Sequence, residues 1–103
     1  MEKWNENNDL GCIEGCALAD VMQQVMSSLA GGYALLCFCE NKSINPNKKK
    51  IRDWEKRREE IRVFSKYYTK IDNSYDDIRR WIRVYSEEVR MVESLRKKYA
   101  DAS

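Results

Sequence analysis

Apolar residues recur every three or four positions in the second half of the chain, which is the spacing of one face of an α-helix. Between Pro46 and Ile71 this apolar stripe consists of Ile51, Trp54, Ile61, Phe64, Tyr68 and Ile71. Between Tyr75 and Tyr99 it consists of Ile78, Ile82, Tyr85, Val89, Val92, Leu95 and Tyr99. The pattern predicts two long helices, over residues 46–71 and 75–99, each about 37 Å long at a rise of 1.5 Å per residue.

Local signals mark where these two helices begin. Asn45 followed by Pro46 is typical of a helix cap with proline at the first helical position. Ser74 with Asp77 three residues later resembles a capping box, with Asp in place of the usual Glu or Gln. Because the hinge over residues 70–74 is short, the two helices should pack antiparallel as a hairpin.

The first part of the chain predicts shorter elements. Apolar residues at helical spacing predict a helix over 13–30, which Gly31-Gly32 should end because glycine tolerates the left-handed cap conformation. Residues 33–39 are a continuous apolar run, and we expect a short buried helix, since an isolated strand would leave its backbone groups unpaired. Residues 1–11 should form a flexible tail, and residues 41–46 a turn-rich connector.

Together these elements predict an all-α fold, a small helical bundle with a long C-terminal antiparallel helical hairpin. One domain would comprise a flexible tail (1–11), a short cysteine-containing helical pair (12–45) and the long hairpin (46–103). A chain of 103 residues suits one domain with one core. The hydrophobic fraction of 43% excludes wholesale disorder, because enough apolar side chain is available to offset the chain entropy.

The location of the protein is predicted from what the sequence lacks. The N-terminus is polar and acidic, whereas a secretory signal places basic residues before an apolar stretch. The segment from Cys16 to Cys39 is long enough to cross a membrane, but it contains Asp20, two glutamines and two serines. These polar positions favour a buried core segment. We therefore expect a cytoplasmic protein with no membrane partner.

The types of residue present argue against an enzyme. The chain has no histidine, which removes the commonest general base and every catalytic triad that contains one. Gly31-Gly32 lacks the Lys-Ser/Thr that completes a phosphate-binding loop. The carboxylates lie beside basic residues on predicted polar helix faces. We expect no catalytic residues.

Four cysteines form two close pairs, Cys12 with Cys16 and Cys37 with Cys39. If Gly31-Gly32 turned the chain, the pairs could meet and four thiolates could surround a zinc ion, or form two disulfides. Neither spacing is that of a Cys-x2-Cys zinc knuckle, and free cysteine often packs as a small hydrophobe. We favour buried free thiols and no cofactor, with a zinc-stabilised helical domain as one alternative.

Charge is distributed unevenly along the chain. Residues 1–45 carry two basic and six acidic side chains, and residues 46–103 carry seventeen basic and eleven acidic ones. The basic residues cluster at the start of each long helix, as Lys48, Lys49, Lys50, Arg52, Lys56 and Arg57 and as Arg79, Arg80 and Arg83. Such clusters attract phosphate backbones, so a nucleic-acid-binding protein is a second alternative. In an antiparallel hairpin the two clusters should lie at opposite ends.

The last helix carries a second apolar stripe, formed by Trp81, Val84, Met91 and Leu95. One neighbouring helix cannot cover both stripes, so the second would be buried by the N-terminal helices, by another copy or by a partner. We predict a non-enzymatic protein–protein interaction module, a small adaptor or inhibitor of the kind encoded by viruses and phages, which docks sterically on a larger protein. The predicted partner-binding residues are Arg52, Arg57, Arg79, Arg80, Trp81, Arg83, Tyr85 and Met91.

Overall fold

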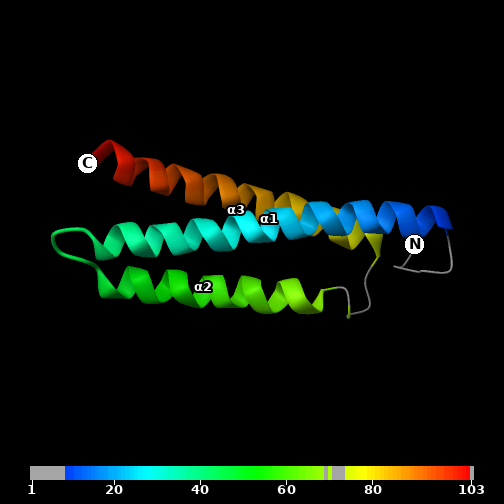
Figure 1. Cartoon of the computed structure of the whole chain (residues 1–103), viewed down its shortest axis with the longest axis horizontal. Coiled ribbons are helices and arrows are strands. Elements are labelled where there is room, and N and C mark those ends of the chain that lie inside the picture. The colour runs from blue at the N-terminus through cyan, green and yellow to red at the C-terminus, as the bar shows by residue number, and fades with distance from the viewer. Residues whose placement is uncertain (1–8, 69, 71–73, 103) are drawn as a thin grey trace.

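The computed structural model describes residues 9–68, 70 and 74–102 of the chain. These residues form three helices, α1 (Asp9–Asn41), α2 (Lys48–Tyr67) and α3 (Tyr75–Ala102), and no strand, so the all-α prediction is confirmed. The helices form an elongated bundle 56 Å long, in which α2 runs antiparallel to both α1 and α3 (Figure 1).

The longest helix, α1, holds the bundle together. Its backbone packs closely along α2 and along α3. In the described part of the chain, by contrast, α2 and α3 approach each other through long side chains and not through their backbones. The predicted C-terminal hairpin is therefore antiparallel but open, with α1 packed against both of its arms.

The core lies along one side of α1. That helix contributes Met22, Met26, Leu29, Tyr33 and Leu36, while the rest of the chain contributes Ile61, Tyr68, Ile78 and Val92. All nine side chains are almost fully buried. Burying one Leu, Ile or Met side chain stabilises a fold by about 1.5–3 kcal/mol, so α1 provides the larger share of the apolar stabilisation.

The prediction that Gly31-Gly32 ends the first helix was wrong. α1 continues unbroken through both glycines, and neither has a positive φ angle. A Cβ atom on Gly32 would lie 2.6 Å from Cγ1 of Val92, whereas a Cβ on Gly31 would meet nothing within 4 Å. Gly32 thus allows α3 to approach α1 closely, and the predicted helical pair is a single long helix.

The start of α2 also differs from the prediction. The capping residue is Asn47 instead of Asn45, and its side-chain oxygen accepts hydrogen bonds from the backbone N–H groups of Lys49 and Lys50 at 3.1 and 3.2 Å. Asn45 and Asn47 are both asparagines that lie just before the helix. Asn47 is the cap because its side chain reaches two backbone N–H groups at the start of α2.

The start of α3 follows the prediction. The backbone N–H of Ser74 donates to Oδ2 of Asp77 at 3.0 Å, and the backbone N–H of Asp77 donates to Oγ of Ser74 at 3.3 Å. This reciprocal pair is the predicted capping box. Upstream, α2 ends at Tyr67 and not at residue 71, which lies outside the described residues together with 72 and 73. Residues 1–8 of the predicted tail also lie outside them, and residues 9–11 belong to α1.

One segment of α1, Gly15–Asn41, is long and apolar enough to cross a membrane by length and composition alone. About a third of its most apolar stretch is buried inside the bundle. A core helix of a water-soluble protein meets the same criterion. Here one side of that segment carries the core residues of the bundle.

Candidate protein-interaction face

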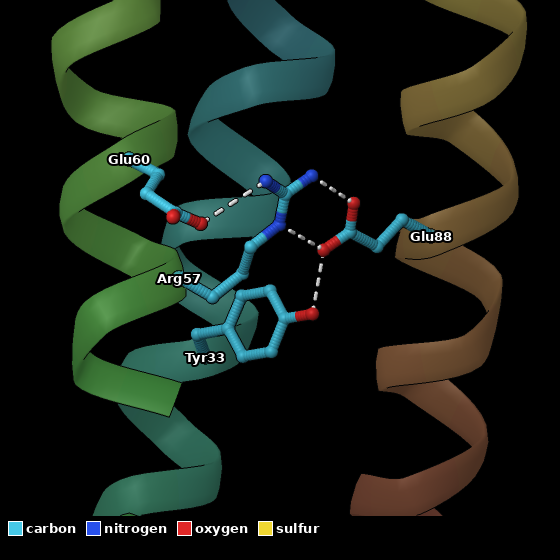
Figure 2. A network of polar contacts seen from close by, with 4 residues as sticks. All are labelled: Tyr33, Arg57, Glu60 and Glu88. Carbon is cyan, nitrogen blue, oxygen red and sulfur yellow. Dashed lines mark hydrogen bonds and ion pairs between the residues drawn. The ribbon is translucent and has the colours of Figure 1, made fainter. Parts of the chain in front are cut away.

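An ion-pair network bridges the open side of the hairpin (Figure 2). From α2, Nε and Nη2 of Arg57 donate to the two carboxylate oxygens of Glu88 on α3, at 2.8 and 2.7 Å. From α1, the hydroxyl of Tyr33 donates to the same carboxylate at 2.6 Å. Nη1 of Arg57 also lies 3.3 Å from Oε1 of Glu60. One carboxylate therefore receives hydrogen bonds from both other helices.

The network fixes the protonation states of its members. Hydrogen bonds from Arg57 hold the pKa of Glu88 below its usual range, although partial burial opposes that shift. Burial and the hydrogen bond to Glu88 together raise the pKa of the Tyr33 hydroxyl well above its ordinary value. At neutral pH Glu88 is ionised and Tyr33 keeps its proton. Such an arrangement is suited to joining helices rather than to transferring a proton.

Aromatic side chains continue the contact between α2 and α3 beyond the network. The ring of Phe64 lies 5.0 Å from that of Trp81 in an edge-on arrangement and 5.9 Å from that of Tyr85. The guanidinium of Arg57 lies over the Tyr85 ring at 5.8 Å. Edge-on aromatic pairs contribute about 0.5–1.5 kcal/mol beyond their buried area. Trp81 and Tyr85 are consequently held in fixed positions, and each keeps part of its surface exposed.

Half-exposed apolar side chains flank these contacts on both helices. Val63 and Tyr67 lie on α2, and Val84 and Met91 lie on α3. Val84 follows Trp81 by three residues and precedes Glu88 by four, so it lies on the same side of α3 as two residues that contact α2. We call the resulting surface the α2/α3 face, and it comprises Arg57, Glu60, Val63, Phe64, Tyr67, Trp81, Val84, Tyr85, Glu88 and Met91.

The structure brings together half of the residues predicted to bind a partner. Arg57, Trp81, Tyr85 and Met91 belong to the α2/α3 face. The other four, Arg52, Arg79, Arg80 and Arg83, are exposed elsewhere. Arg79 and Arg80 lie 3.0 Å from the carboxylates of Asp76 and Asp77, which offset their charge.

Sequence reasoning overlooked Glu88 and Tyr33. A signal for Glu88 was present, because Trp81, Glu88 and Leu95 follow one another at seven-residue steps on one side of the last helix. A carboxylate inside an apolar stripe indicates a buried polar partner on a neighbouring helix. No such signal marks Tyr33, which lies in an apolar run.

The two basic clusters lie at opposite ends of the hairpin, as predicted, because α2 and α3 begin at opposite ends of the bundle (Figure 1). The continuous α1 helix also excludes a single zinc site made of all four cysteines. Cys16 and Cys37 lie 21 residues apart on one helix, which separates them by about 32 Å. Cys37 is buried and its thiol donates to the carbonyl oxygen of Ile51 at 3.7 Å.

Among the residues whose side chains the structure describes, no group of three or more His, Cys, Asp or Glu residues is placed to hold a metal ion. Comparison with protein-family models, with curated proteins and with solved structures found no match to this chain. Its function is therefore argued from its own surface.

Proposed function

We propose that this chain is a non-enzymatic protein-interaction module, a small adaptor or inhibitor that binds a larger protein through the α2/α3 face. The observation that carries the proposal is the row of half-exposed apolar side chains on both sides of the Arg57–Glu88 bridge, namely Val63, Tyr67, Val84 and Met91. Binding to a partner would remove this apolar surface from water.

The composition of the face supports this function. Tyr, Trp, Met and Arg are enriched in protein interfaces, and Trp, Tyr and Arg are the commonest residues at which truncation strongly weakens binding. The face contains all four types, and Phe64 holds Trp81 and Tyr85 in place before any partner arrives. A surface that is already ordered loses little conformational entropy on binding.

The mechanism we propose is steric. Glu88, the more buried of the two carboxylates of the face, already accepts three hydrogen bonds from Arg57 and Tyr33, so it is poorly placed to act as a base. Two stiff helices would instead present a fixed surface that covers a site on the partner or joins it to another protein.

The test is a pull-down from lysate with the tagged chain, comparing three baits. The wild-type bait should capture a discrete protein in both nuclease-treated and untreated lysate. Val84→Asp places a charge in the centre of the face and should abolish the capture. Val21→Asp places the same charge at another exposed valine, on α1 and outside the face, and should leave the capture unchanged.

Each contrary outcome has a definite meaning. Capture that disappears after nuclease treatment would replace the proposal with nucleic-acid binding. Capture that survives Val84→Asp, or that both substitutions abolish equally, would exclude the α2/α3 face as the binding surface. Circular dichroism of each variant checks that the bundle is still folded.

A further inference from the structure

The end of the bundle that carries the α1–α2 loop combines apolar and basic side chains from all three helices. The loop over residues 42–47 lies at the same end as the C-terminus of α3 (Figure 1). Between them is a hollow of about 750 Å³, to which Phe38, Cys39 and Ile44 contribute from one side and Tyr99 from the other. Among the residues that the structure describes, no acidic side chain lines this hollow.

The apolar residues at this end are unusually exposed. Ile44 is completely exposed at the tip of the loop, and Phe38 is about half-exposed on the last turns of α1. Leu35, one turn before Phe38, is also exposed. It lies near Arg96, which also lines the hollow. These three side chains form an apolar strip that extends from α1 onto the loop.

Basic side chains surround the apolar strip. Residues 38–53 and 96–101 contain eight basic and three acidic side chains, which leaves a net charge of +5. The basic ones are Lys42, Lys48, Lys49, Lys50, Arg52, Arg96, Lys97 and Lys98. Of these eight side chains, only that of Lys49 forms an ion pair within the described part of the chain, with Asp53. The charge is therefore available to an anionic surface.

The loop that carries Ile44 is held in place by a buried carboxylate. Glu40 accepts hydrogen bonds from the Tyr99 hydroxyl, from the Ser43 hydroxyl and from the backbone N–H of Asn47. The bond from Tyr99 is the largest of several effects that keep the pKa of Glu40 below its usual range. This anchor fixes the loop to the end of α3, so the apolar tip and the basic residues of both elements keep their relative positions.

We propose that this end of the bundle docks on the surface of a lipid bilayer that contains anionic phospholipids. Ile44 and Phe38 would enter the interface between headgroups and acyl chains, and the surrounding Lys and Arg side chains would contact the phosphate and carboxylate groups of the headgroups. Apolar residues next to basic ones are the combination that peripheral membrane proteins use at such surfaces. This inference concerns a site separate from the α2/α3 face and does not depend on it.

Charge and shape favour a bilayer over a nucleic acid. A phosphate backbone would use the lysines, but it would leave Ile44 and Leu35 exposed to water. A bilayer uses both kinds of side chain, because its anionic headgroups lie directly above an apolar layer. The proposal departs from the expectation of no membrane partner, which was based on the low suitability of residues 16–39 as a membrane span.

The test is co-sedimentation of the full chain with vesicles of phosphatidylcholine alone or of phosphatidylcholine mixed with phosphatidylserine. The wild-type chain should bind the mixed vesicles and not the neutral ones. Ile44→Ser should weaken the partition by about tenfold, because the apolar group that enters the bilayer is lost. Lys97→Gln should weaken it by about fivefold, as expected for one basic residue near an anionic surface.

Matched control variants are available elsewhere on the bundle. Val21→Ser removes an exposed apolar group from α1, outside both proposed surfaces, and Lys66→Gln removes a lysine from the last turn of α2, at the opposite end. Neither should change the partition. Because Ile44 makes no buried contact, Ile44→Ser should keep the wild-type thermal midpoint.

Three results would overturn the proposal. Equal binding to neutral and anionic vesicles would remove the role of the basic residues. An unchanged partition of Ile44→Ser together with displacement by duplex DNA would identify a polyanion-binding surface instead. If Lys66→Gln and Lys97→Gln weakened vesicle binding equally, net charge alone would attract the chain, and no particular end of the bundle would dock. None of these outcomes bears on capture of a protein by the α2/α3 face.

Discussion

Gly32 and Val92 meet in a close contact between α1 and α3. The Val92 side chain occupies the space that a Cβ atom on residue 32 would need. Val92 itself is buried and β-branched, so it has little freedom to turn away. The neighbouring Gly31 is in the same helix, but it faces open space. The two glycines therefore provide a matched pair of positions for substitution.

We predict that Gly31→Ala and Gly32→Ala change stability in opposite directions. Gly31→Ala should raise the free energy of unfolding by about 0.5–1 kcal/mol, because alanine is the better helix former and meets no neighbour. Gly32→Ala should lower it by about 1–3 kcal/mol, because the added methyl group overpacks the contact with Val92. Urea unfolding of the two variants measures both values. Equal stabilisation by both would show that the close contact is not present.

Glu88 connects α3 to α2 through its ion pair with Arg57. Its side chain is 16% exposed, whereas that of Arg57 is 37% exposed. Breaking a fully buried ion pair costs about 3–5 kcal/mol, but water screens a pair that is open on one side. The stabilisation from this pair should therefore lie between that of a surface pair and that of a buried one.

We predict that Glu88→Gln lowers the free energy of unfolding by about 1–2 kcal/mol, since Arg57 and Tyr33 both lose their charged acceptor. Glu60→Gln removes the exposed contact to the same Arg57 and should cost less than about 0.5 kcal/mol. Chemical unfolding of both variants gives the comparison. If the two substitutions cost the same amount, the bridge does not stabilise the bundle.

At the scale of the helices, the sequence predicted that the segments are helical more accurately than it predicted where each helix begins and ends. The apolar stripes of α2 and α3 have a helical period, and both helices exist. The continuity of α1 was missed, because the propensity of Gly31-Gly32 to end a helix is a local effect. The packing of Gly32 against Val92, which lies 60 residues further along the chain, is a tertiary contact. No local signal reveals such a contact.

For the α2/α3 face, too, a pattern within one helix could be recognised in the sequence, whereas contacts between helices could not. The second stripe of the last helix includes Trp81, whose ring packs against Phe64 of α2, and the half-exposed Met91. The sequence did not reveal that Phe64 packs against Trp81 or that Arg57 pairs with Glu88, because both contacts join different helices. Arg79 and Arg80 were also predicted to bind a partner. Each forms an ion pair with an acidic residue one turn earlier, Arg79 with Asp76 and Arg80 with Asp77.

The capping box of α3 is the local signal that the structure confirms most directly, and it can be tested by itself. Ser74→Ala removes the side-chain oxygen that accepts the Asp77 N–H, so the free energy of unfolding should fall by about 1 kcal/mol. Ser94→Ala, at an exposed position inside the same helix, should be neutral or slightly stabilising. Thermal unfolding distinguishes them. A neutral Ser74→Ala would mean that the cap does not stabilise α3.

At the scale of the whole molecule, two carboxylates tie the three helices together. Glu88 joins them near the middle of the bundle, and Glu40 joins α1, the loop and α3 at one end. Hydrogen bonding lowers the pKa of both below the ordinary glutamate range. Both are therefore ionised in the folded chain at neutral pH, and their contacts depend on that charge.

We predict that the bundle loses stability in acid. The pKa of an unfolded glutamate is about 4.3, so a lower value in the folded chain means that the ionised form stabilises the fold above that pH. The stabilisation disappears as the pH falls through the lowered pKa values. Thermal midpoints measured from neutral pH down to about pH 3 should show this fall. The double variant Glu40→Gln, Glu88→Gln should be less stable at neutral pH and should show a flatter pH profile. A wild-type midpoint that rises on acidification would contradict the prediction.

The central position of α1 has a consequence for how the molecule folds. A six-residue loop joins α1 to α2, so their pairing closes only a short stretch of chain, whereas α3 must reach α1 across the whole of α2. We expect the α1–α2 pair to form in the folding transition state and α3 to dock afterwards. Ile61→Val should then slow folding, and Val92→Ala should chiefly speed unfolding. The α2/α3 face is on this view the last surface to assemble and the first to open, and a partner bound there would slow unfolding as well as raise equilibrium stability.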